Sequence, residues 1–449
     1  MCSLWAAGED RGRVGKGVLS AAERPTVAGA PWAGRCEDME LEPLARAIGT
    51  PAYVYSSAHI RDQYRLLAHA LSTVAHRIHY SVKANSSLAI LALLRELGAG
   101  VDIVSGGELY RALIAGYSGN DVVFSGVGKT EQELREALGA GVLLFNVESE
   151  AELRQLDRIA RNMGAPAQRS PAPAAIRVNP EVTVETPHPY TRTGERGMKF
   201  GIPYDEAPGV ARNALRMPGI SLRGVAMHIG SQVTALKSYE EGLRRLLEIV
   251  SVLRELGCRD LEYLDVGGGL AVTYEDEMPT DPEAFAGIFL RAIGDSGMKL
   301  IVEPGRYLTG NAGVLLTRVL YRKRSGGREY VITDAGMNDL LRPSHYQAYH
   351  HISSARPRGS VQTYDVVGPV CESGDFLALD RSMDAVSEGD LLIVHSAGAY
   401  GFVMASNYNS RPRPPEVLVA GDRYAIVRER ETYEDLIRHE HASANWRRL

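Results

Sequence analysis

The feature that most constrains this chain is a regular alternation of short extended runs with helical patterns between residues 79 and 302. The helical patterns separate the runs, as in Leu88–Leu97, which Gly98 closes. Eight runs are found, namely His79–Val82, Val101–Val104, Val122–Phe124, Val142–Val147, Ala175–Val178, Gly224–His228, Tyr263–Val266 and Leu300–Val302. Eight strands alternating with helices over about 225 residues are typical of a (β/α)8 barrel. The sequence therefore predicts an α/β fold with such a barrel over residues 76–309.

After Gly310 the pattern changes to strand-like runs that follow one another with turn signals between them. These runs are Leu315–Tyr321, Glu329–Thr333, Gln362–Val367, Leu391–His395 and Glu416–Val419. They predict a β-sandwich or β-barrel-like domain over residues 310–449. An earlier extended run, Pro51–Tyr55, is not needed to close the barrel, so we expect the strand and helix of residues 39–75 to join the β domain.

Two segments depart from these patterns. Residues 1–38 lack hydrophobic periodicity and offer little apolar surface to offset the entropy of ordering. We therefore expect a disordered or mis-started extension, with Met39 opening the structured chain. The Pro- and Ala-rich stretch Ala165–Ala174 is expected to be a surface loop, whereas the long segment Asn179–Gly201 is a candidate binding segment.

Composition excludes several classes of function. Lys and Arg number 50 against 55 Asp and Glu, so the net charge of −5 offers no positive field for nucleic acid. No run of 18 apolar residues is present, and we expect no membrane span. The four cysteines lie far apart without a C-x-x-C pair, which argues against a disulfide framework and against a metal site. A reducing, cytoplasmic location is expected.

Polar residues that follow the barrel strands form the candidate site, because the carboxyl ends of the strands of such a barrel face the active site. These residues are Lys83, Asp102, Arg177, His228, Ser231, Gly267, Gly268, Gly269, Glu303, Gly305 and Arg306. A lysine deprotonated by burial or by neighbouring charge can form a Schiff base with a carbonyl cofactor. Backbone N–H groups of the glycines can approach a phosphate, and a carboxylate can keep a pyridine nitrogen protonated. The inferred cofactor is pyridoxal 5′-phosphate.

Four motifs resemble, in order, those of the alanine-racemase-like, pyridoxal-phosphate-dependent decarboxylases, and most closely those of the diaminopimelate decarboxylase family. They are Tyr80–Asn85, His228–Gln232, Glu303–Arg306 and Cys371–Asp375, and the resemblance runs from Leu41 to Val419. It implies that Lys83 carries the cofactor, that His228 stacks on the pyridine ring and that Glu303 faces its nitrogen. It further implies that Ser231, Gly268 and Glu303–Arg306 hold the phosphate, with Tyr400 reaching both phosphate and substrate.

The resemblance also implies a homodimer, since Cys371 and Glu372 come from the partner subunit in such enzymes. Diaminopimelate carries an amino acid group at both ends. Arg306 and Arg342 suit its distal carboxylate, Tyr346 adds a hydroxyl, and Glu372 suits the distal ammonium.

The reaction implied is decarboxylation of meso-2,6-diaminopimelate to L-lysine and CO₂, the last step of lysine biosynthesis. Cys371 is the first candidate for the proton donor and Lys83 the second. Two alternatives remain open at this point: decarboxylation of ornithine or arginine on the same fold, and a non-catalytic regulatory homologue.

Overall fold

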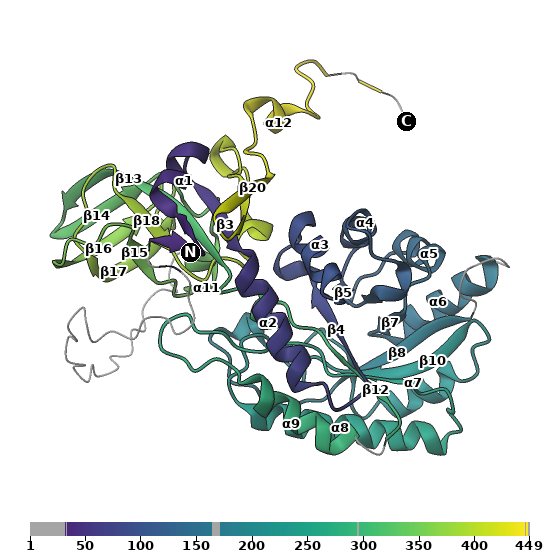
Figure 1. The fold of residues 1–449 in the computed structure, drawn as a ribbon. Coiled ribbons are helices and arrows are strands. Elements are labelled where there is room, and N and C mark those ends of the chain that lie inside the picture. The colour runs from purple at the N-terminus through teal and green to yellow at the C-terminus, as the bar shows by residue number, and fades with distance from the viewer. Residues whose placement is uncertain (1–31, 33, 164–170, 294–295, 445, 448–449) are drawn as a thin grey trace, which may run out of the picture.

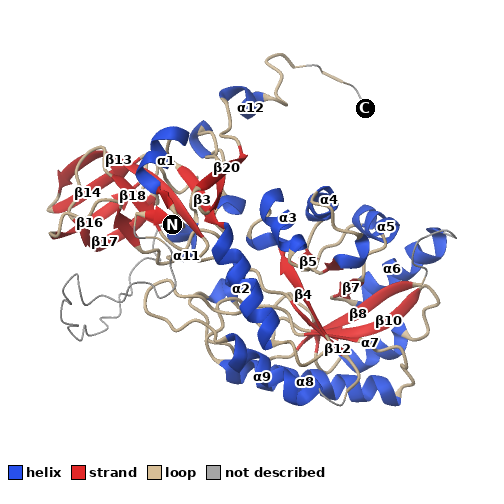
Figure 2. Cartoon of the chain, viewed as in Figure 1, coloured by secondary structure: helices blue, strands red, loops and turns tan. Residues whose placement is uncertain are grey.

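The computed structural model describes residues 32, 34–163, 171–293, 296–444 and 446–447. These residues form a (β/α)8 barrel and a separate β-rich domain (Figure 1), and the two halves differ clearly in their content of helix and strand (Figure 2). No helix in the described part of the chain is long and apolar enough to cross a membrane.

Eight parallel strands form the closed barrel. They are β4 (His76–Ser81), β5 (Gly100–Ile103), β6 (Val122–Phe124), β7 (Leu144–Val147), β8 (Ala172–Asn179), β10 (Ile220–Ala226), β11 (Tyr263–Asp265) and β12 (Lys299–Val302). Closure follows from the pairings of β12 with β4 and of β8 with β10, while the short β9 (Ile202–Pro203) pairs only with β8. All eight predicted strands are thus confirmed. Side chains such as Val123, Leu144 and Ile301 form a small buried core of their own.

Seven helices that follow the strands cover the barrel: α3 (Leu88–Glu96), α4 (Gly106–Ile114), α5 (Glu131–Ala140), α6 (Glu150–Met163), α7 (Ala207–Ala214), α8 (Leu236–Glu255) and α9 (Pro282–Ile293). After β12 only the short α10 (Arg306–Thr309) forms before the chain leaves the barrel. The gap in the ring is filled by α2 (Ser57–Ala70), which packs against α9, α3 and α10 (Figure 1). The helix also contacts β19 of the β domain, so α2 packs mainly on the barrel and in part on the β domain, to which the sequence analysis assigned it.

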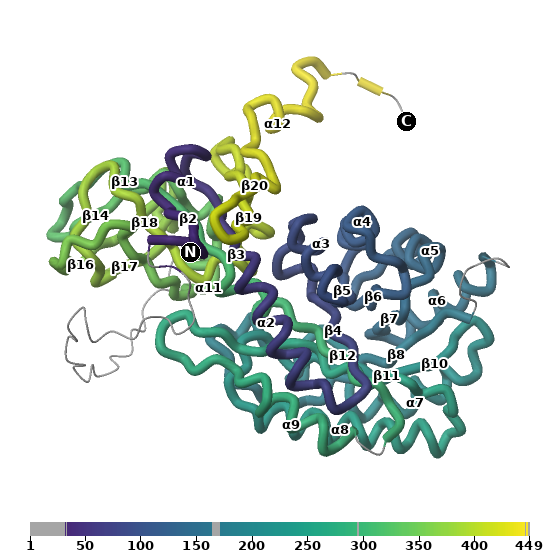
Figure 3. Tube along the Cα trace, in the orientation of Figure 1, coloured from purple at the N-terminus to yellow at the C-terminus, as the bar shows by residue number. Residues whose placement is uncertain are grey.

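The β domain is organised around β13 (Gly313–Ser325), which pairs with β14 (Arg328–Thr333), β18 (Leu391–Val394) and β3 (Ala52–Ser56). The strand β3 lies between β13 and β19 (Glu416–Ala420), so the expectation that this early strand joins the β domain is confirmed. Further strands are β15 (Ile352–Ser354), β16 (Val361–Val367), β17 (Phe376–Asp384) and β20 (Arg423–Arg428). Beyond β20 the chain runs through the short α12 (Tyr433–Ile437) and projects from the domain (Figure 3).

The structured chain begins before Met39, unlike the expectation for residues 1–38. Cys36 is buried, and Arg35–Cys36 (β1) pairs with Met39–Glu40 (β2) ahead of α1 (Leu41–Ile48). Trp32 is also buried and donates from Nε1 to the carbonyl of Asn311 (3.1 Å). The boundary at residue 38 is therefore wrong for residues 34–38, while residues 1–31 and 33 lie outside the described residues.

The expected surface loop Ala165–Ala174 is likewise corrected in part. Its last residues, Ala172–Ala174, open β8 and are buried, because β8 is longer than its apolar run indicates and pairs with strands on both sides. Residues 164–170 lie outside the described part of the chain.

Glu37 should be the main anchor of the N-terminal segment. Its Oε1 accepts hydrogen bonds from Ser56 Oγ (2.8 Å) and from the backbone N–H of Ala58 (2.9 Å), and its Oε2 accepts one from Gly421 N–H (2.5 Å). We expect Glu37→Ala to lower the free energy of unfolding by about 1 to 3 kcal/mol, since two backbone donors lose a charged acceptor. Urea unfolding measures this loss. Glu40→Ala, which removes only an exposed partner of Arg35, should change stability little, and equal effects of the two would contradict the anchor.

Candidate active site

A cavity of about 450 Å³ lies at the carboxyl ends of the barrel strands, where both domains contribute to its wall. From the barrel come Lys83, Ser125, Asn146, Arg177, His228, Ser231, Glu303 and Arg306, and from the β domain come Arg342, Tyr346 and Tyr400. Tyr190 and Phe200 of the segment Asn179–Gly201 also line it. The structure thus brings together most of the residues that the sequence singled out.

Lys83 lies in a short turn, Val82–Ala84, directly after β4, and its Nζ donates to Asp102 Oδ2 at 2.9 Å. Asp102 is fully buried on β5 and also accepts a hydrogen bond from Ser81 Oγ (2.9 Å). Burial lowers the pKa of Lys83, whereas the nearby carboxylates of Asp102 and Glu303 raise it. Together the carboxylates outweigh burial, so the pKa of Lys83 lies above its usual value. These acidic neighbours therefore favour the charged form of Lys83, whereas formation of a Schiff base requires the neutral amine.

Three carboxyl groups, those of Asp102, Asp265 and Glu303, are buried at this end of the barrel. Burial raises the pKa of Asp265 to about 6. Burial, with the nearby Asp102 and Asp265, raises the pKa of Glu303 well above its usual range. Asn146 Nδ2 donates to Asp265 Oδ2 (2.7 Å) and lies 3.5 Å from Glu303 Oε1. Lys83 is the one lysine of the described chain that forms an ion pair with any of these groups, and it pairs with Asp102 alone, so the site favours a further positive charge.

His228 follows β10 and lies beside the glycine segment that follows β11. Its Nδ1 accepts a hydrogen bond from Gly268 N–H (3.3 Å), and burial together with the Lys83 and Arg177 cations lowers its pKa to about 3. The ring is therefore neutral, with its remaining proton on Nε2. A Cβ atom at position 268 would lie 2.1 Å from the carbonyl oxygen of Glu303, so only glycine allows this close approach of two chain segments.

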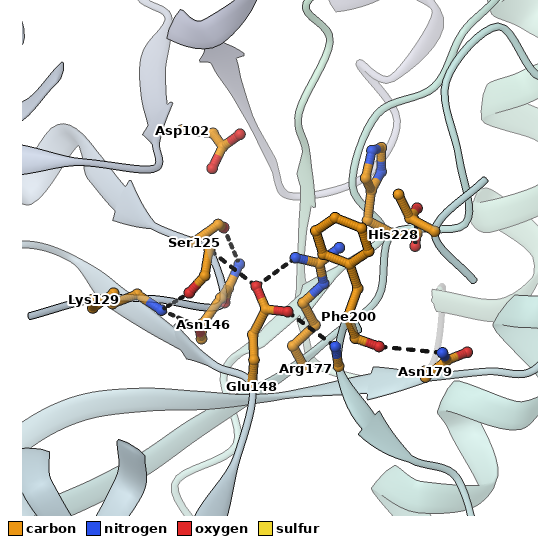
Figure 4. A network of polar contacts seen from close by, with 12 residues as sticks. Asp102, Ser125, Lys129, Asn146, Glu148, Arg177, Asn179, Phe200 and His228 are labelled. Carbon is orange, nitrogen blue, oxygen red and sulfur yellow. Dashed lines mark hydrogen bonds and ion pairs between the residues drawn. The ribbon is translucent and has the colours of Figure 1, made fainter. Parts of the chain in front are cut away.

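Arg177 is fixed by an acid that the sequence analysis did not select. Its Nη1 donates to Glu148 Oε1 at 2.6 Å, and its guanidinium lies 5.3 Å from the ring centre of Phe200 (Figure 4). Glu148 also accepts hydrogen bonds from the backbone N–H groups of Gly126 (3.0 Å) and Gly201 (2.9 Å). One carboxylate thereby holds together the loops that follow β6, β7 and β8.

Arg306 and Arg342 are buried, at 6% and 7% exposure, yet neither forms an ion pair with a carboxylate of the described chain. Aromatic rings surround them instead. The Arg306 guanidinium lies 4.8 Å from the ring centre of Tyr400, and that of Arg342 lies 5.8 Å from the ring centre of Tyr346. Arg306 Nη2 also donates to Ser231 Oγ (3.0 Å). Two buried guanidinium groups without acidic partners form a prepared binding site for an anion.

Cys371 and Glu372 do not lie in this cavity. They are exposed on the loop between β16 and β17, where Cys371 N–H donates to Asn409 Oδ1 (2.8 Å). Within a single chain the structure therefore separates these two residues from the others that the sequence predicted for the site.

The residues that the sequence analysis missed lie mostly at the ends of β6 and β7. Ser125 follows β6 and Glu148 follows β7, so the rule that selected Lys83 would have found both if applied to all eight strands, whereas Asn146 lies within β7. Tyr274 and His350 pack behind the arginines and carry no such signal, since they reach the site only through tertiary contacts.

Comparison with known proteins gives a consistent result. Residues 57–310 match the family model described as the pyridoxal binding domain of pyridoxal-dependent decarboxylases. The diaminopimelate decarboxylase of Pseudomonas aeruginosa is 49% identical over 405 residues, which cover 89% of this chain and 95% of that protein. The corresponding protein of Vibrio cholerae is 47% identical over 407 residues, covering 90% and 95%.

Solved structures agree with these sequence matches. The Helicobacter pylori diaminopimelate decarboxylase complexed with L-lysine is 40% identical, with a TM-score of 0.85 over 89% of this chain and 98% of that chain. The M. jannaschii enzyme in co-complex with L-lysine is 36% identical, with a TM-score of 0.84 over 90% and 95%.

Replacing Asp102 should change the reactivity of Lys83. We expect Asp102→Asn to lower the pKa of the Lys83 ammonium, because the variant lacks the nearest carboxylate. In the apoprotein, acetylation of Lys83 should then proceed faster at a given pH, and its rate profile should move to lower pH. Peptide mass spectrometry measures both. Lys299, which pairs with Glu262 on the surface, is the internal control, and an unchanged Lys83 profile would show that Asp102 does not govern its charge.

Proposed function

The chain belongs to the pyridoxal-dependent decarboxylases, and within them to the diaminopimelate decarboxylases, and on this premise we propose that it converts meso-2,6-diaminopimelate to L-lysine and CO₂. This reaction is the last step of lysine biosynthesis. The observation that carries the proposal is the pair of buried arginines, Arg306 and Arg342, which share the cavity with Lys83 and have no acidic partner among the described residues.

The residues present fit pyridoxal 5′-phosphate, the cofactor of this family. Lys83 would hold its carbonyl carbon, and Gly268, Ser231 and the chain segment Glu303–Arg306 would hold its phosphate, which leaves the guanidinium of Arg306 to the substrate. Three buried carboxyl groups share one lysine, and a protonated pyridine nitrogen facing Glu303 would supply the missing positive charge. When bound, the cofactor would supply an electron sink for the bond to the departing carboxylate.

The substrate assignment follows from charge. Meso-diaminopimelate has a carboxylate at its distal end, and the two guanidinium groups would pair with it in a cavity that excludes most water. Ornithine would place an ammonium group beside the same two cations, which costs free energy. Arginine would place a guanidinium group beside the two cations, which also costs free energy. The cavity therefore disfavours the alternative of an ornithine or arginine decarboxylase, and the presence of Lys83 and Glu303 in it disfavours a regulatory protein without activity.

Proton movement can be assigned to residues of the chain. Asp102 Oδ2, 2.9 Å from Lys83 Nζ, holds the ammonium proton on the lysine and orients the lysine in the site. Cys371 would deliver the proton that replaces CO₂, with Lys83 as the second candidate. In this proposal the thiol comes from the partner subunit, since Cys371 is exposed and lies outside the cavity of its own chain.

A homodimer with shared active sites accounts for this placement. Glu372 and its neighbour Tyr408 are both exposed on the same surface of the β domain as Cys371, and a partner seated there would bring Glu372 to the distal ammonium group. We place the enzyme in the cytoplasm, because Cys36, Cys258 and Cys371 are all free thiols.

The arginine site gives the first test of the function. Wild-type protein should release CO₂ from meso-diaminopimelate and discriminate against L-lysine and ornithine by about 10⁴ to 10⁵, since these leave a buried cation unpaired. Arg342→Ala should lose about 2 to 4 kcal/mol in kcat/KM for meso-diaminopimelate while retaining the cofactor's absorbance. A wild type that prefers ornithine, or unchanged kinetics in the variant, would refute the distal-carboxylate site.

Subunit mixing tests the shared site. Lys83→Ala and Cys371→Ala proteins should each be inactive, but exchange of their subunits should restore about a quarter of wild-type activity. In a random mixture half of the dimers are mixed, and each of these has one of its two sites intact. Activity is measured after exchange has been verified by native mass spectrometry. Mixing Lys83→Ala with an Asp102→Ala protein is the control and should restore nothing, because both residues lie in one chain's cavity. Failure of the first mixture despite complete exchange would place Cys371 and Lys83 in the same subunit's site.

A further inference from the structure

Two side chains that the proposed mechanism does not use lie directly behind the paired arginines. Arg306 Nη1 donates a hydrogen bond to the hydroxyl of Tyr274, and Arg342 Nε donates one to His350 Nε2 (3.3 Å). The rings of Tyr274 and His350 contact each other edge to face, with centres 5.4 Å apart and planes at 85°. The guanidinium of Arg342 also lies over Tyr274, 5.2 Å from its ring centre. The two arginines thus share one buried support.

The hydrogen bonds of His350 can run in only one direction. Its Nδ1 lies 2.8 Å from the carbonyl oxygen of His395, which can only accept, so Nδ1 carries the proton. Nε2 of the neutral ring is then an acceptor, and the guanidinium of Arg342 is a donor only. Burial, with the cations of Arg342 and Arg381, lowers the pKa of His350 to about 3, which keeps the ring in this neutral form.

The position of His350 is itself fixed. The residue is fully buried, and its carbonyl oxygen accepts a hydrogen bond from Arg381 Nη1 (2.5 Å). The next residue is tied to β18, because His395 N–H donates to the carbonyl of His351 (2.8 Å). The imidazole therefore has one available orientation, and it presents Nε2 to Arg342 without a rearrangement of the β domain.

This arrangement leaves one edge of the Arg342 guanidinium for a ligand. A carboxylate can bind in bidentate fashion either through Nε and one Nη atom or through the two Nη atoms. His350 occupies Nε, and within the described residues the guanidinium of Arg342 donates no other hydrogen bond and forms no ion pair. The edge with the two Nη atoms is left to the ligand.

We propose that His350 is the positioning residue that aims Arg342 at the distal carboxylate of the substrate, and that Tyr274 does the same for Arg306. The inference rests on the proposed function and deepens it. Specificity for a substrate with a distal carboxylate then depends on a neutral histidine and a tyrosine hydroxyl that lie outside the lining of the cavity with Lys83. Their removal weakens substrate binding rather than the chemical step.

The test compares His350→Leu with His350→Gln in the cofactor-loaded enzyme. His350→Leu should raise KM for meso-diaminopimelate about 10- to 100-fold, with a much smaller change in kcat, because the lost hydrogen bond involves a charged group. His350→Gln, which keeps an acceptor for Arg342 Nε, should recover most of this loss. Tyr274→Phe should raise KM in the same way through Arg306.

A buried residue of the same domain controls for general loss of stability. Tyr364, on β16, donates from its hydroxyl to Gln362 and contacts neither arginine, so Tyr364→Phe should leave KM unchanged. Thermal unfolding of all variants shows how much stability each one loses. If His350→Leu does not fold, the KM values of His350→Gln and Tyr274→Phe still test the inference. A KM shift in Tyr364→Phe as large as theirs would overturn the inference.

The decisive measurement is a double-mutant cycle with Arg342→Ala. If His350 acts through Arg342, adding His350→Leu to Arg342→Ala should cause little further loss of kcat/KM. Additive losses, or a lowered kcat with KM unchanged, would show that His350 has a structural role only. The wild-type substrate preference is measured separately. Preference for ornithine refutes the proposed function, whereas additive losses with meso-diaminopimelate as the substrate refute only the positioning role.

Discussion

The site depends on a balance of buried charge at the carboxyl ends of the barrel strands. Asp102, Asp265 and Glu303 lie close enough to raise or lower one another's pKa, and Lys83 is the lysine that pairs with them. Burial penalises each ionised carboxyl group, so the charge of each depends on the others. A group that brings a further positive charge would stabilise this arrangement, and the proposed placement of the pyridine nitrogen beside Glu303 would supply that charge.

Another part of the same cavity carries an excess of positive charge. Arg306 and Arg342 are buried among aromatic rings rather than carboxylates, so this part of the wall favours an anion. The two parts of the cavity wall therefore favour charges of opposite sign, a cation beside the carboxyl groups and an anion beside the arginines. The charge of the cavity selects an amino acid with a second carboxylate over a diamine. Backbone shape alone does not make this distinction.

The barrel could be predicted from the sequence because its strands are short apolar runs that helices separate, and its active-site end follows from the chain direction. The role of α2 could not be predicted, since the strand before it, β3, belongs to the β domain while its own apolar face packs on the barrel. The protonation of Lys83 also depends on tertiary distance, because sequence order does not show that Asp102 lies 2.9 Å from Nζ. His350 and Tyr274 were missed for the same reason.

The chain passes from the β domain to the barrel, and contacts between the two domains fix the position of one half of the site relative to the other. Strand β3 lies within the β domain, and α2, which follows it directly, completes the barrel. Next to Lys83, Tyr400 N–H donates to the carbonyl of Ala84 (2.7 Å), and Asn85 Nδ2 donates to the carbonyl of Gly398 (3.0 Å). These bonds join the lysine turn to the β domain at the cavity itself. Since Arg342 and Tyr346 of the β domain line the same cavity as Lys83, the distance between Lys83 and these residues depends on the contact between the two domains.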